Sequence, residues 1–261
     1  MTWSELSVAL VQEASGVEPA ANRERLAELT PPGADLVVFP EAYARDFGPV
    51  GDDVSAAAEP LDGPFATEVA RLAAERGSTV VAGMFETSAD PTRPFNTLVV
   101  ASPEGRVTAS YRKIHLYDSF GNRESDRLSP GEVEPVVVDV AGVPVGLMTC
   151  YDLRFPELAR RVVDAGAEVI VLPAAWVAGK RKLDHWQTLV RARAIENTVY
   201  VVAAGQPAPR YTGIRRLARL GLTERAFSSR ARSRVARTRP LPSDPSASTS
   251  PNGSTTSECP V

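Results

Sequence analysis

Three short segments of the sequence carry side chains that could perform chemistry together. VVFPE ends in Glu41, SYRKIHL contains Lys113, and GLMTC ends in Cys150. A thiol can attack a carbonyl carbon once a carboxylate within hydrogen-bond distance has removed its proton. An ammonium group can stabilise the negative oxygen that then develops. Cysteine, glutamate and lysine together could therefore transfer the acyl group of an amide.

These side chains can act together only if the fold brings three distant segments to one place. Each of them follows a run of residues typical of a β-strand, and the ends of neighbouring strands are where α/β sheets gather functional groups. The segment PELARRVVDAGA after Cys150 predicts a helix with Pro156 in its first turn. We expect the positive end of this helix to favour the thiolate form of Cys150.

The chain up to residue 212 alternates strand-like and helix-like segments. Apolar residues at helical spacing predict helices over 21–29, 65–77, 156–167 and 184–198. Valine-rich runs predict strands over 6–12, 35–41, 78–86, 95–113, 133–150, 167–176 and 199–206. Turn signals at 103–105 and 141–144 divide two of these runs into hairpins. The pattern predicts one α/β domain with mixed strand pairing.

Composition sets the class of protein and its environment. The chain has 261 residues, of which 43% are hydrophobic, which is enough for a sizeable globular core. It contains no run near the roughly 18 apolar residues that a membrane helix needs, and its first residues do not resemble a signal peptide. The cysteines, Cys150 and Cys259, lie in different contexts and predict no disulfide framework. We expect a cytoplasmic protein.

Each candidate residue also has an ordinary structural interpretation. A cysteine at a strand end is often a small core residue, and Glu41 or Lys113 alone could be a loop charge. A papain-type hydrolase would pair Cys150 with His115 or His185 instead, but the sequence around the cysteine lacks the papain signature. No group of cysteines and histidines has the spacing of metal ligands, and no glycine-rich phosphate loop is present.

The order of the motifs resembles a known family. VVFPE, YRKIHLYD and GLMTCYDLRFPELAR are similar to segments of the nitrilase superfamily of carbon–nitrogen hydrolases, in its bacterial amidase-like branch. The resemblance covers about residues 5–213. It implies a four-layer α-β-β-α sandwich and a Cys–Glu–Lys catalytic triad that needs no cofactor and no metal.

The resemblance also assigns roles to individual residues. It implies that Cys150 is the nucleophile, that Glu41 is the general base and acid, and that Lys113 stabilises the oxyanion. The segment NRESDRLSPG also matches, so its Glu124 fits a second glutamate that positions the lysine and the substrate. The backbone N–H of Tyr151 would then complete the oxyanion hole.

Two further residues could contact the substrate. Trp176, in PAAW, would form an apolar wall of the pocket, although a plain core position explains it equally well. Arg154 could pair with a carboxylate of the substrate or could hold its own loop through an ion pair.

CYDLRFPELAR looks most similar to the amidases that act on amides of dicarboxylates, such as ω-amidases and deaminated glutathione amidases. We therefore expect hydrolysis of a small carboxylate-bearing amide to acid and ammonia through a thioester. The same triad would also allow nitrile, carbamoyl or acyl-transfer substrates. The resemblance further implies a homodimer, provided that the C-terminal part of the family fold is intact.

The sequence changes character after Gly213. Residues 213–261 contain nine arginines and three acids, whereas the whole chain has a net charge of −3, so residues 1–212 form an acidic body. The segment shows no strand alternation and becomes rich in serine, threonine and proline. We expect residues 1–213 to form the hydrolase domain and 214–261 to form a largely disordered tail. The sandwich would then be incomplete at its C-terminus.

Two hypotheses account for this tail. One hypothesis is a shift of reading frame near Gly213. If one C preceded the codons of Ile214 and Arg215, they could read as His followed by Ser, Pro or Thr, and YTGHS is a continuation that the family commonly shows. A genuine basic tail could instead bind nucleic acid or another acidic partner in a catalytically impaired protein. Nucleic acid is the less favoured partner, because no aromatic residues alternate with the arginines.

Overall fold

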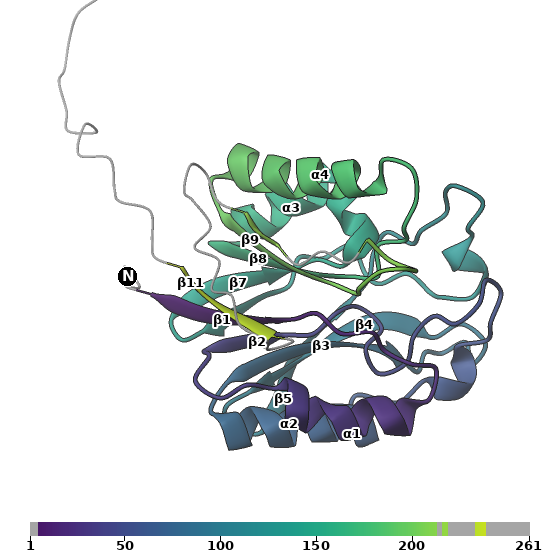
Figure 1. Cartoon of the computed structure of the whole chain (residues 1–261), viewed down its shortest axis with the longest axis horizontal. Coiled ribbons are helices and arrows are strands. Elements are labelled where there is room, and N and C mark those ends of the chain that lie inside the picture. The colour runs from purple at the N-terminus through teal and green to yellow at the C-terminus, as the bar shows by residue number, and fades with distance from the viewer. Residues whose placement is uncertain (1–4, 213–215, 219–232, 239–261) are drawn as a thin grey trace, which may run out of the picture.

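The structure is a computed structural model that describes residues 5–212, 216–218 and 233–238. Two β-sheets pack face to face, and two α-helices cover the outer face of each sheet (Figure 1). The expected α/β class and the four-layer α-β-β-α sandwich are therefore confirmed. Among the described residues, no helix combines the length and the apolar character needed to cross a bilayer.

The first sheet has six strands in the order β11-β1-β2-β3-β4-β5. Its strands from the N-terminal half are β1 Leu6–Val11, β2 Leu36–Val38, β3 Thr79–Glu86, β4 Phe95–Ser102 and β5 Arg106–Arg112. Helices α1 Pro19–Leu29 and α2 Pro64–Arg76 cover its outer face. Because both faces of β2 and β3 are covered, all of their residues are buried, and they read as continuous apolar runs in the sequence.

The second sheet has five strands in the order β10-β9-β8-β7-β6. Four of them are β6 Val137–Val140, β7 Val143–Leu147, β8 Val169–Ala174 and β9 Tyr200–Gly205. Helices α3 Pro156–Asp164 and α4 Lys182–Asn197 cover this sheet. In the described part of the chain, 3-10 helices lie in loops at η1 Ser55–Ala57, η2 Glu124–Asp126 and η3 Cys150–Arg154.

Two short strands follow Gly213, where the sequence pattern predicted none. The strand β10, Arg216–Ala218, pairs antiparallel with β9, and β11, Ser233–Thr238, pairs antiparallel with β1. Each adds an edge to one sheet. Edge pairing uses backbone N–H and C=O groups, so it needs no alternation of apolar side chains. The rest of 214–261 lies outside the described residues, and the expected disorder and reading-frame shift stay predictions.

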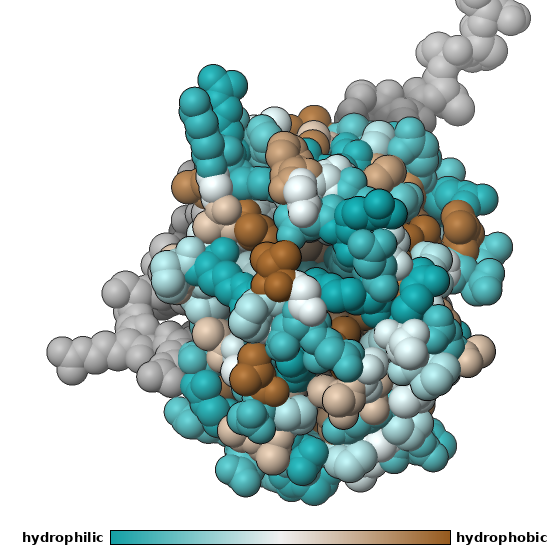
Figure 2. Space-filling view, turned by 90° about the vertical axis from the view of Figure 1, so that its right-hand side faces the viewer, coloured by the Kyte–Doolittle hydropathy of each residue, from teal (hydrophilic) through white to brown (hydrophobic). Residues whose placement is uncertain are grey.

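Strand direction places the three candidate catalytic residues at one end of the sandwich. β2 and β3 run parallel, while β4 is antiparallel to both β3 and β5, so β2 and β5 point the same way. Glu41 follows β2, Lys113 directly follows β5, and Cys150 follows β7 of the facing sheet. Figure 2 looks onto this end, where hydrophilic side chains cover most of the surface and hydrophobic ones lie singly between them.

A close backbone crossing holds the segment that carries Glu41. The N–H of Ala44 donates to the carbonyl oxygen of Gly83 at 2.9 Å, so this segment passes directly over β3. A Cβ atom at Gly83 would lie 2.5 Å from the backbone nitrogen of Ala42 and 2.8 Å from Cα of Glu41. Only glycine allows this approach.

We predict that Gly83→Ala destabilises the fold and displaces Glu41. The added methyl group meets backbone rather than a flexible side chain, so the free energy of unfolding should fall by about 1–3 kcal/mol, as for an overpacked core. Urea denaturation measures this change. Gly16→Ala is the matched control, because its Cβ would lie 3.6 Å from Asn22, an ordinary contact. Equal stabilities of the two variants would contradict the close backbone approach at Gly83.

Candidate active site

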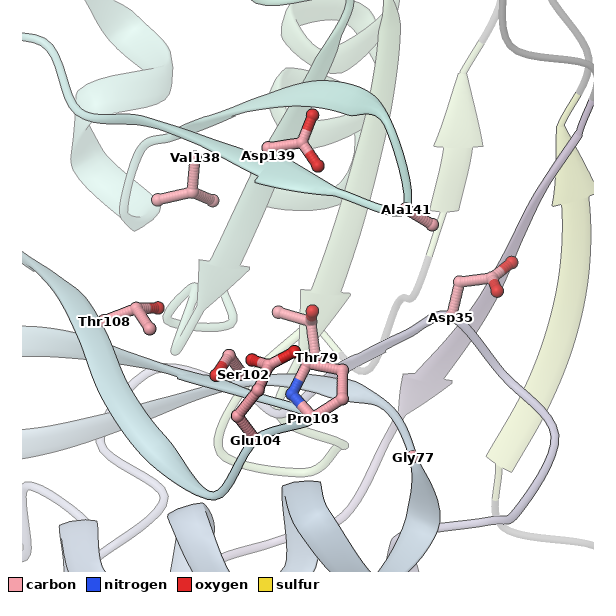
Figure 3. Close-up of a pocket in the computed structure, with 10 residues that line it drawn as sticks. All are labelled: Asp35, Gly77, Thr79, Ser102, Pro103, Glu104, Thr108, Val138, Asp139 and Ala141. Carbon is pink, nitrogen blue, oxygen red and sulfur yellow. The ribbon is translucent and has the colours of Figure 1, made fainter.

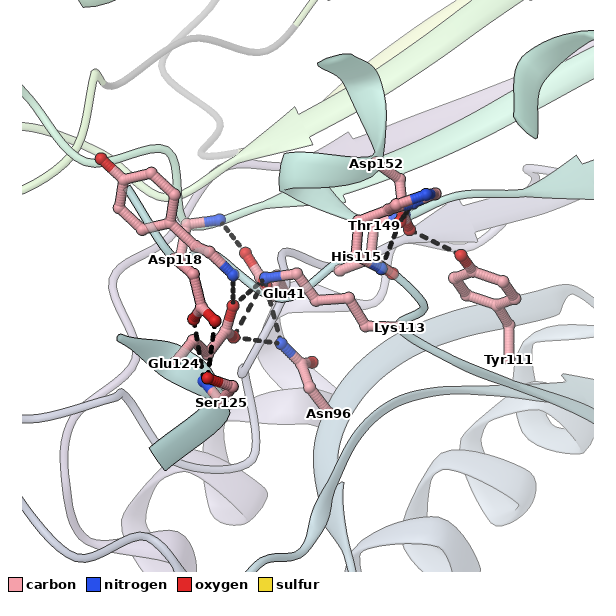
Figure 4. A network of polar contacts seen from close by, with 12 residues as sticks. Glu41, Asn96, Tyr111, Lys113, His115, Asp118, Glu124, Ser125, Thr149 and Asp152 are labelled. Carbon is pink, nitrogen blue, oxygen red and sulfur yellow. Dashed lines mark hydrogen bonds and ion pairs between the residues drawn. The ribbon is translucent and has the colours of Figure 1, made fainter. Parts of the chain in front are cut away.

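The side chain of Lys113 lies between two buried carboxylates (Figure 4). Its Nζ donates to Oε1 of Glu41 at 2.9 Å and to both oxygens of Glu124, at 3.0 and 2.9 Å. All three side chains are buried, with exposures of 1% for Lys113 and Glu41 and 6% for Glu124. Charges at this depth persist only when they are paired and hydrogen-bonded, and this arrangement provides both.

The two carboxylates keep Lys113 charged. Burial by itself lowers the pKa of its ammonium group, but the negative charges of Glu124 and Glu41 outweigh burial and hold the pKa well above its ordinary value. The group is therefore an ammonium ion throughout the physiological range. It can stabilise developing negative charge without being able to act as a base.

Both oxygens of Glu41 are held by donors. Oε1 accepts from Nδ2 of Asn96 at 2.7 Å in addition to Lys113, and Oε2 accepts from the backbone N–H of Ala175 at 2.6 Å. Since these donors come from β4, the end of β5 and the end of β8, both sheets fix the orientation of the carboxylate. The side chain is therefore rigidly held and buried.

Cys150 is the first residue of η3, shortly after β7, and its backbone is strained. Its φ is 46°, in the left-handed region that non-glycine residues rarely adopt. The side chain is buried with 7% exposure, and the nearby carboxylate of Glu41 raises the pKa of its thiol. Strain at a reactive residue persists only where the surroundings impose it, and here it presents the thiol to the glutamate and the lysine.

The resting form of Cys150 differs from the expected thiolate. Burial raises the pKa of the thiol well above its usual range, and the charge of Glu41 raises it further. Lys113 acts in the opposite direction without offsetting them. The helix that was expected to favour the thiolate, α3, begins at Pro156 as predicted, and the 3-10 helix η3 precedes it. The thiol is therefore neutral until Glu41 accepts its proton.

Glu124 lies in η2 and is the second carboxylate that binds the lysine. Besides Lys113, it accepts from the backbone N–H of Tyr117 at 2.5 Å and from Nδ2 of Asn96 at 3.4 Å. These contacts attach the loop after β5 to the ammonium group. A positioning role for Glu124 agrees with this geometry.

Asn96 was not identified from the sequence. It lies at the start of β4 and is 1% exposed, and its Nδ2 donates to the carboxylates of both Glu41 and Glu124. The available signal was a polar amide near the start of a largely apolar strand, FNTLVV. That signal does not reveal the partners, because both of them come from other loops.

Asp152 connects the loop of the lysine to the loop of the cysteine. It accepts from the hydroxyl of Tyr111 at 2.6 Å and from the backbone N–H of Thr149 at 2.9 Å. It also contacts His115, whose backbone N–H and ring Nδ1 lie 3.1 and 2.7 Å from Oδ1. Asp152 is fully buried and holds residues on both sides of the site at fixed distance.

Neither histidine takes the place of Glu41. His115 bonds to Asp152 and stacks on Phe155 with ring centroids 3.6 Å apart. His185 faces a guanidinium nitrogen of Arg154, with its Nδ1 at 3.3 Å. The described contacts place neither imidazole on Cys150, which removes the geometric basis of a papain-type pair.

A small cavity adjoins the thiol and has a volume of about 20 Å³. Tyr151, Arg154 and Trp176 all line it, as does Lys182, which the sequence analysis did not single out. Trp176 is 4% exposed, so it belongs both to the pocket wall and to the core. A cavity of this size holds about one water molecule.

Arg154 has no carboxylate partner within the described part of the chain. Its guanidinium carbon lies 5.0 Å from the ring centroid of Trp176, and its Nε is buried without a hydrogen-bond partner. An ion pair that merely holds its own loop is therefore not found among these residues. The charge faces the same cavity as the thiol.

A larger open cavity, of about 590 Å³, lies away from these residues (Figure 3). Asp35, Ser102, Glu104 and Asp139 are among the residues that line it, and its lining includes none of Cys150, Glu41 and Lys113. Across the described ranges, no group of three or more histidine, cysteine, aspartate or glutamate side chains is arranged to hold a metal ion.

Comparisons with known proteins agree with this geometry. The profile of the family described as carbon–nitrogen hydrolase matches residues 7–260, which includes all but the last residue of the segment after Gly213. A hydrolase from Mycobacterium tuberculosis is 47% identical over 210 residues, covering 78% of this chain and 73% of that protein. A deaminated glutathione amidase from Escherichia coli O157:H7 is 45% identical over 172 residues, covering 66% of this chain and 64% of the amidase.

A solved structure gives the same result at the level of the fold. XC1258 from Xanthomonas campestris, a CN-hydrolase superfamily protein with an arsenic adduct in its active site, superposes with a TM-score of 0.78 and 28% identity. The match covers 90% of this chain and 91% of that one. Because a family profile spans almost the whole sequence and close relatives share it, the chain belongs to the carbon–nitrogen hydrolase family.

Proposed function

We propose that this protein hydrolyses a small, carboxylate-bearing aliphatic amide to the acid and ammonia, through a thioester on Cys150. The observation that carries the proposal is the contact between the buried ammonium of Lys113 and Glu41, the carboxylate whose charge raises the pKa of the Cys150 thiol. Nucleophile, base and electrostatic stabiliser thus converge in one buried site.

In the first half of the reaction, Glu41 takes the proton of the Cys150 thiol as sulfur attacks the amide carbonyl carbon. The carbonyl oxygen becomes negative, and Lys113 with the backbone N–H of Tyr151 stabilises it. Glu41 then gives its proton to the leaving nitrogen. The C–N bond breaks, ammonia leaves, and the acyl group remains bound to sulfur.

In the second half, water replaces ammonia. Glu41 removes a proton from the water as its oxygen attacks the thioester carbon, and the same two donors hold the oxyanion. The C–S bond breaks and the proton returns from Glu41 to sulfur. Carboxylic acid leaves, and the neutral thiol favoured by the buried site is restored.

The charge of Arg154 supports a substrate that carries a carboxylate. Its guanidinium lines the cavity beside the thiol and lacks an anionic partner among the described residues. The name of the E. coli relative, deaminated glutathione amidase, supports amide rather than nitrile, carbamoyl or acyl-transfer chemistry. A homodimer remains part of the proposal and rests on the family resemblance.

We predict that Cys150→Ala abolishes hydrolysis. Without sulfur no thioester forms, so ammonia release from succinamate and related ω-amides should fall to the background rate. Cys259→Ala is the control, because it removes the other cysteine of the chain and should retain activity. Rapid-quench mass spectrometry of the wild-type protein should detect the acyl group on Cys150. Ammonia release that survives Cys150→Ala would refute the nucleophile assignment.

Glu124→Gln tests the second carboxylate. The amide keeps the size of the side chain but removes one charge that holds Lys113, so kcat should fall by about 10²–10³-fold, as when one transition-state stabiliser is lost. Steady-state ammonia release gives kcat and KM separately. Asp126→Asn is the matched control in the same 3-10 helix, since Asp126 is 59% exposed and pairs with Arg123 on the surface. An equal decrease in both variants would argue against a specific role.

The raised pKa of Cys150 predicts slow alkylation near neutral pH. In a Cys259→Ala background, the rate of modification by iodoacetamide should rise with pH through a midpoint above about 8.5, the ordinary thiol value. Glu41→Gln removes a charge and a hydrogen bond that raise this pKa, so its midpoint should move to lower pH. Mass spectrometry over pH 5–11 measures both. A wild-type midpoint well below pH 7 would indicate a resting thiolate and contradict the mechanism.

A further inference from the structure

A second cation, Lys182, lies in the cavity beside Cys150, together with Arg154. It is the first residue of α4, and the loop 175–181 connects it to the end of β8. Neither the triad nor its supporting residues use this charge. Its position at the thiol cavity requires a separate explanation.

Aromatic side chains hold the ammonium group of Lys182 in place. Its Nζ lies 4.1 Å from the ring centroid of Phe120, 4.9 Å from that of Tyr117 and 5.8 Å from that of Trp176. Nζ also donates to the hydroxyl of Tyr117 at 2.8 Å, and Nε1 of Trp176 donates to the carbonyl oxygen of Lys182 at 2.9 Å. Contacts on three sides keep the charge at the cavity rather than in open solvent.

The ammonium group keeps hydrogen-bonding capacity for an anion. It has three N–H donors, and one of them bonds to Tyr117. No carboxylate lies within ion-pair distance of Lys182 or Arg154 in the described residues, whereas Lys113 contacts two. Two unpaired cations therefore face a cavity whose inner end holds the nucleophile.

The size of the cavity limits the ligand. At about 20 Å³ it holds about one water molecule, so a four-carbon amide enters only when Lys182 or Phe120 moves outward. Phe120 is 68% exposed and can shift without leaving a core. An acyl chain that reaches from the thiol to Lys182 within this space is short.

We propose that Lys182 binds the distal carboxylate of the substrate and thereby selects ω-amides of short dicarboxylic acids over neutral amides. This inference rests on the proposed function for its substrate class. The carboxylate accepts the free N–H groups of Lys182, and Arg154 adds a second positive charge at the same cavity. The amide end is then directed to Cys150.

A pair of substrates of equal carbon length tests the inference. Succinamate carries the carboxylate, and butanamide has a methyl group in its place. Lys182→Met should lower kcat/KM for succinamate by about 10- to 100-fold more than for butanamide, mainly through KM, as expected for a lost hydrogen bond to a charged group. Lys182→Arg should retain part of the preference. Lys180→Met, an exposed lysine of the same loop, is the charge-matched control.

Equal decreases for both substrates in Lys182→Met would indicate a structural role and overturn the inference. An equal loss of preference in Lys180→Met would also overturn it, because the effect would then come from overall charge. The inference would also be overturned if the wild-type protein hydrolysed succinamate without preferring it to butanamide.

Protection of the thiol gives a readout without turnover. Succinate, at constant ionic strength, should slow the alkylation of Cys150 by iodoacetamide in the wild type and in Lys180→Met, but not in Lys182→Met. Equal protection of all three proteins, or of none, would overturn the role of Lys182. If protection depends on Lys182 while no amide is hydrolysed, the proposed function fails and the carboxylate site stands.

Discussion

The buried ammonium of Lys113 is the constraint on which the site depends. A buried charge without a partner is strongly destabilising. Removal of either carboxylate would leave the buried ammonium with less compensating charge and would destabilise the fold. Glu41 and Glu124 come from different loops, and both must close on the lysine for its charge to be tolerated. The same ion pairs that stabilise the interior therefore assemble the catalytic groups.

The protonation states follow from this arrangement. Two carboxylates and one ammonium leave the site with excess negative charge, and the buried thiol responds by staying neutral. When the proton moves from Cys150 to Glu41, the negative charge moves from the carboxylate to sulfur, and the net charge of the site does not change. A neutral resting thiol also limits reaction with adventitious electrophiles, because the thiolate is the nucleophilic form.

Much of the fold could be predicted from the sequence because its central strands are apolar on both faces and the helices α1, α2 and α3 begin with proline. β2, β3 and β8 were each located within a few residues, and the hairpin at Gly105 was placed correctly. The strands β10 and β11 were not predicted, because backbone pairing at a sheet edge leaves little pattern in the side chains. The left-handed backbone conformation of Cys150 could not be predicted from the sequence either.

The sequence alone determined which residue types could perform the chemistry, since Glu41, Lys113 and Cys150 each follow a recognisable strand and carry motifs with strong family resemblance. Only the tertiary structure decided their protonation and their partners. Asn96, Asp152 and Lys182 gain their significance from residues far away in the chain. The depth of burial that raises the pKa of the thiol is likewise a property of packed layers, because desolvation depends on every atom that excludes water and not on neighbours in sequence.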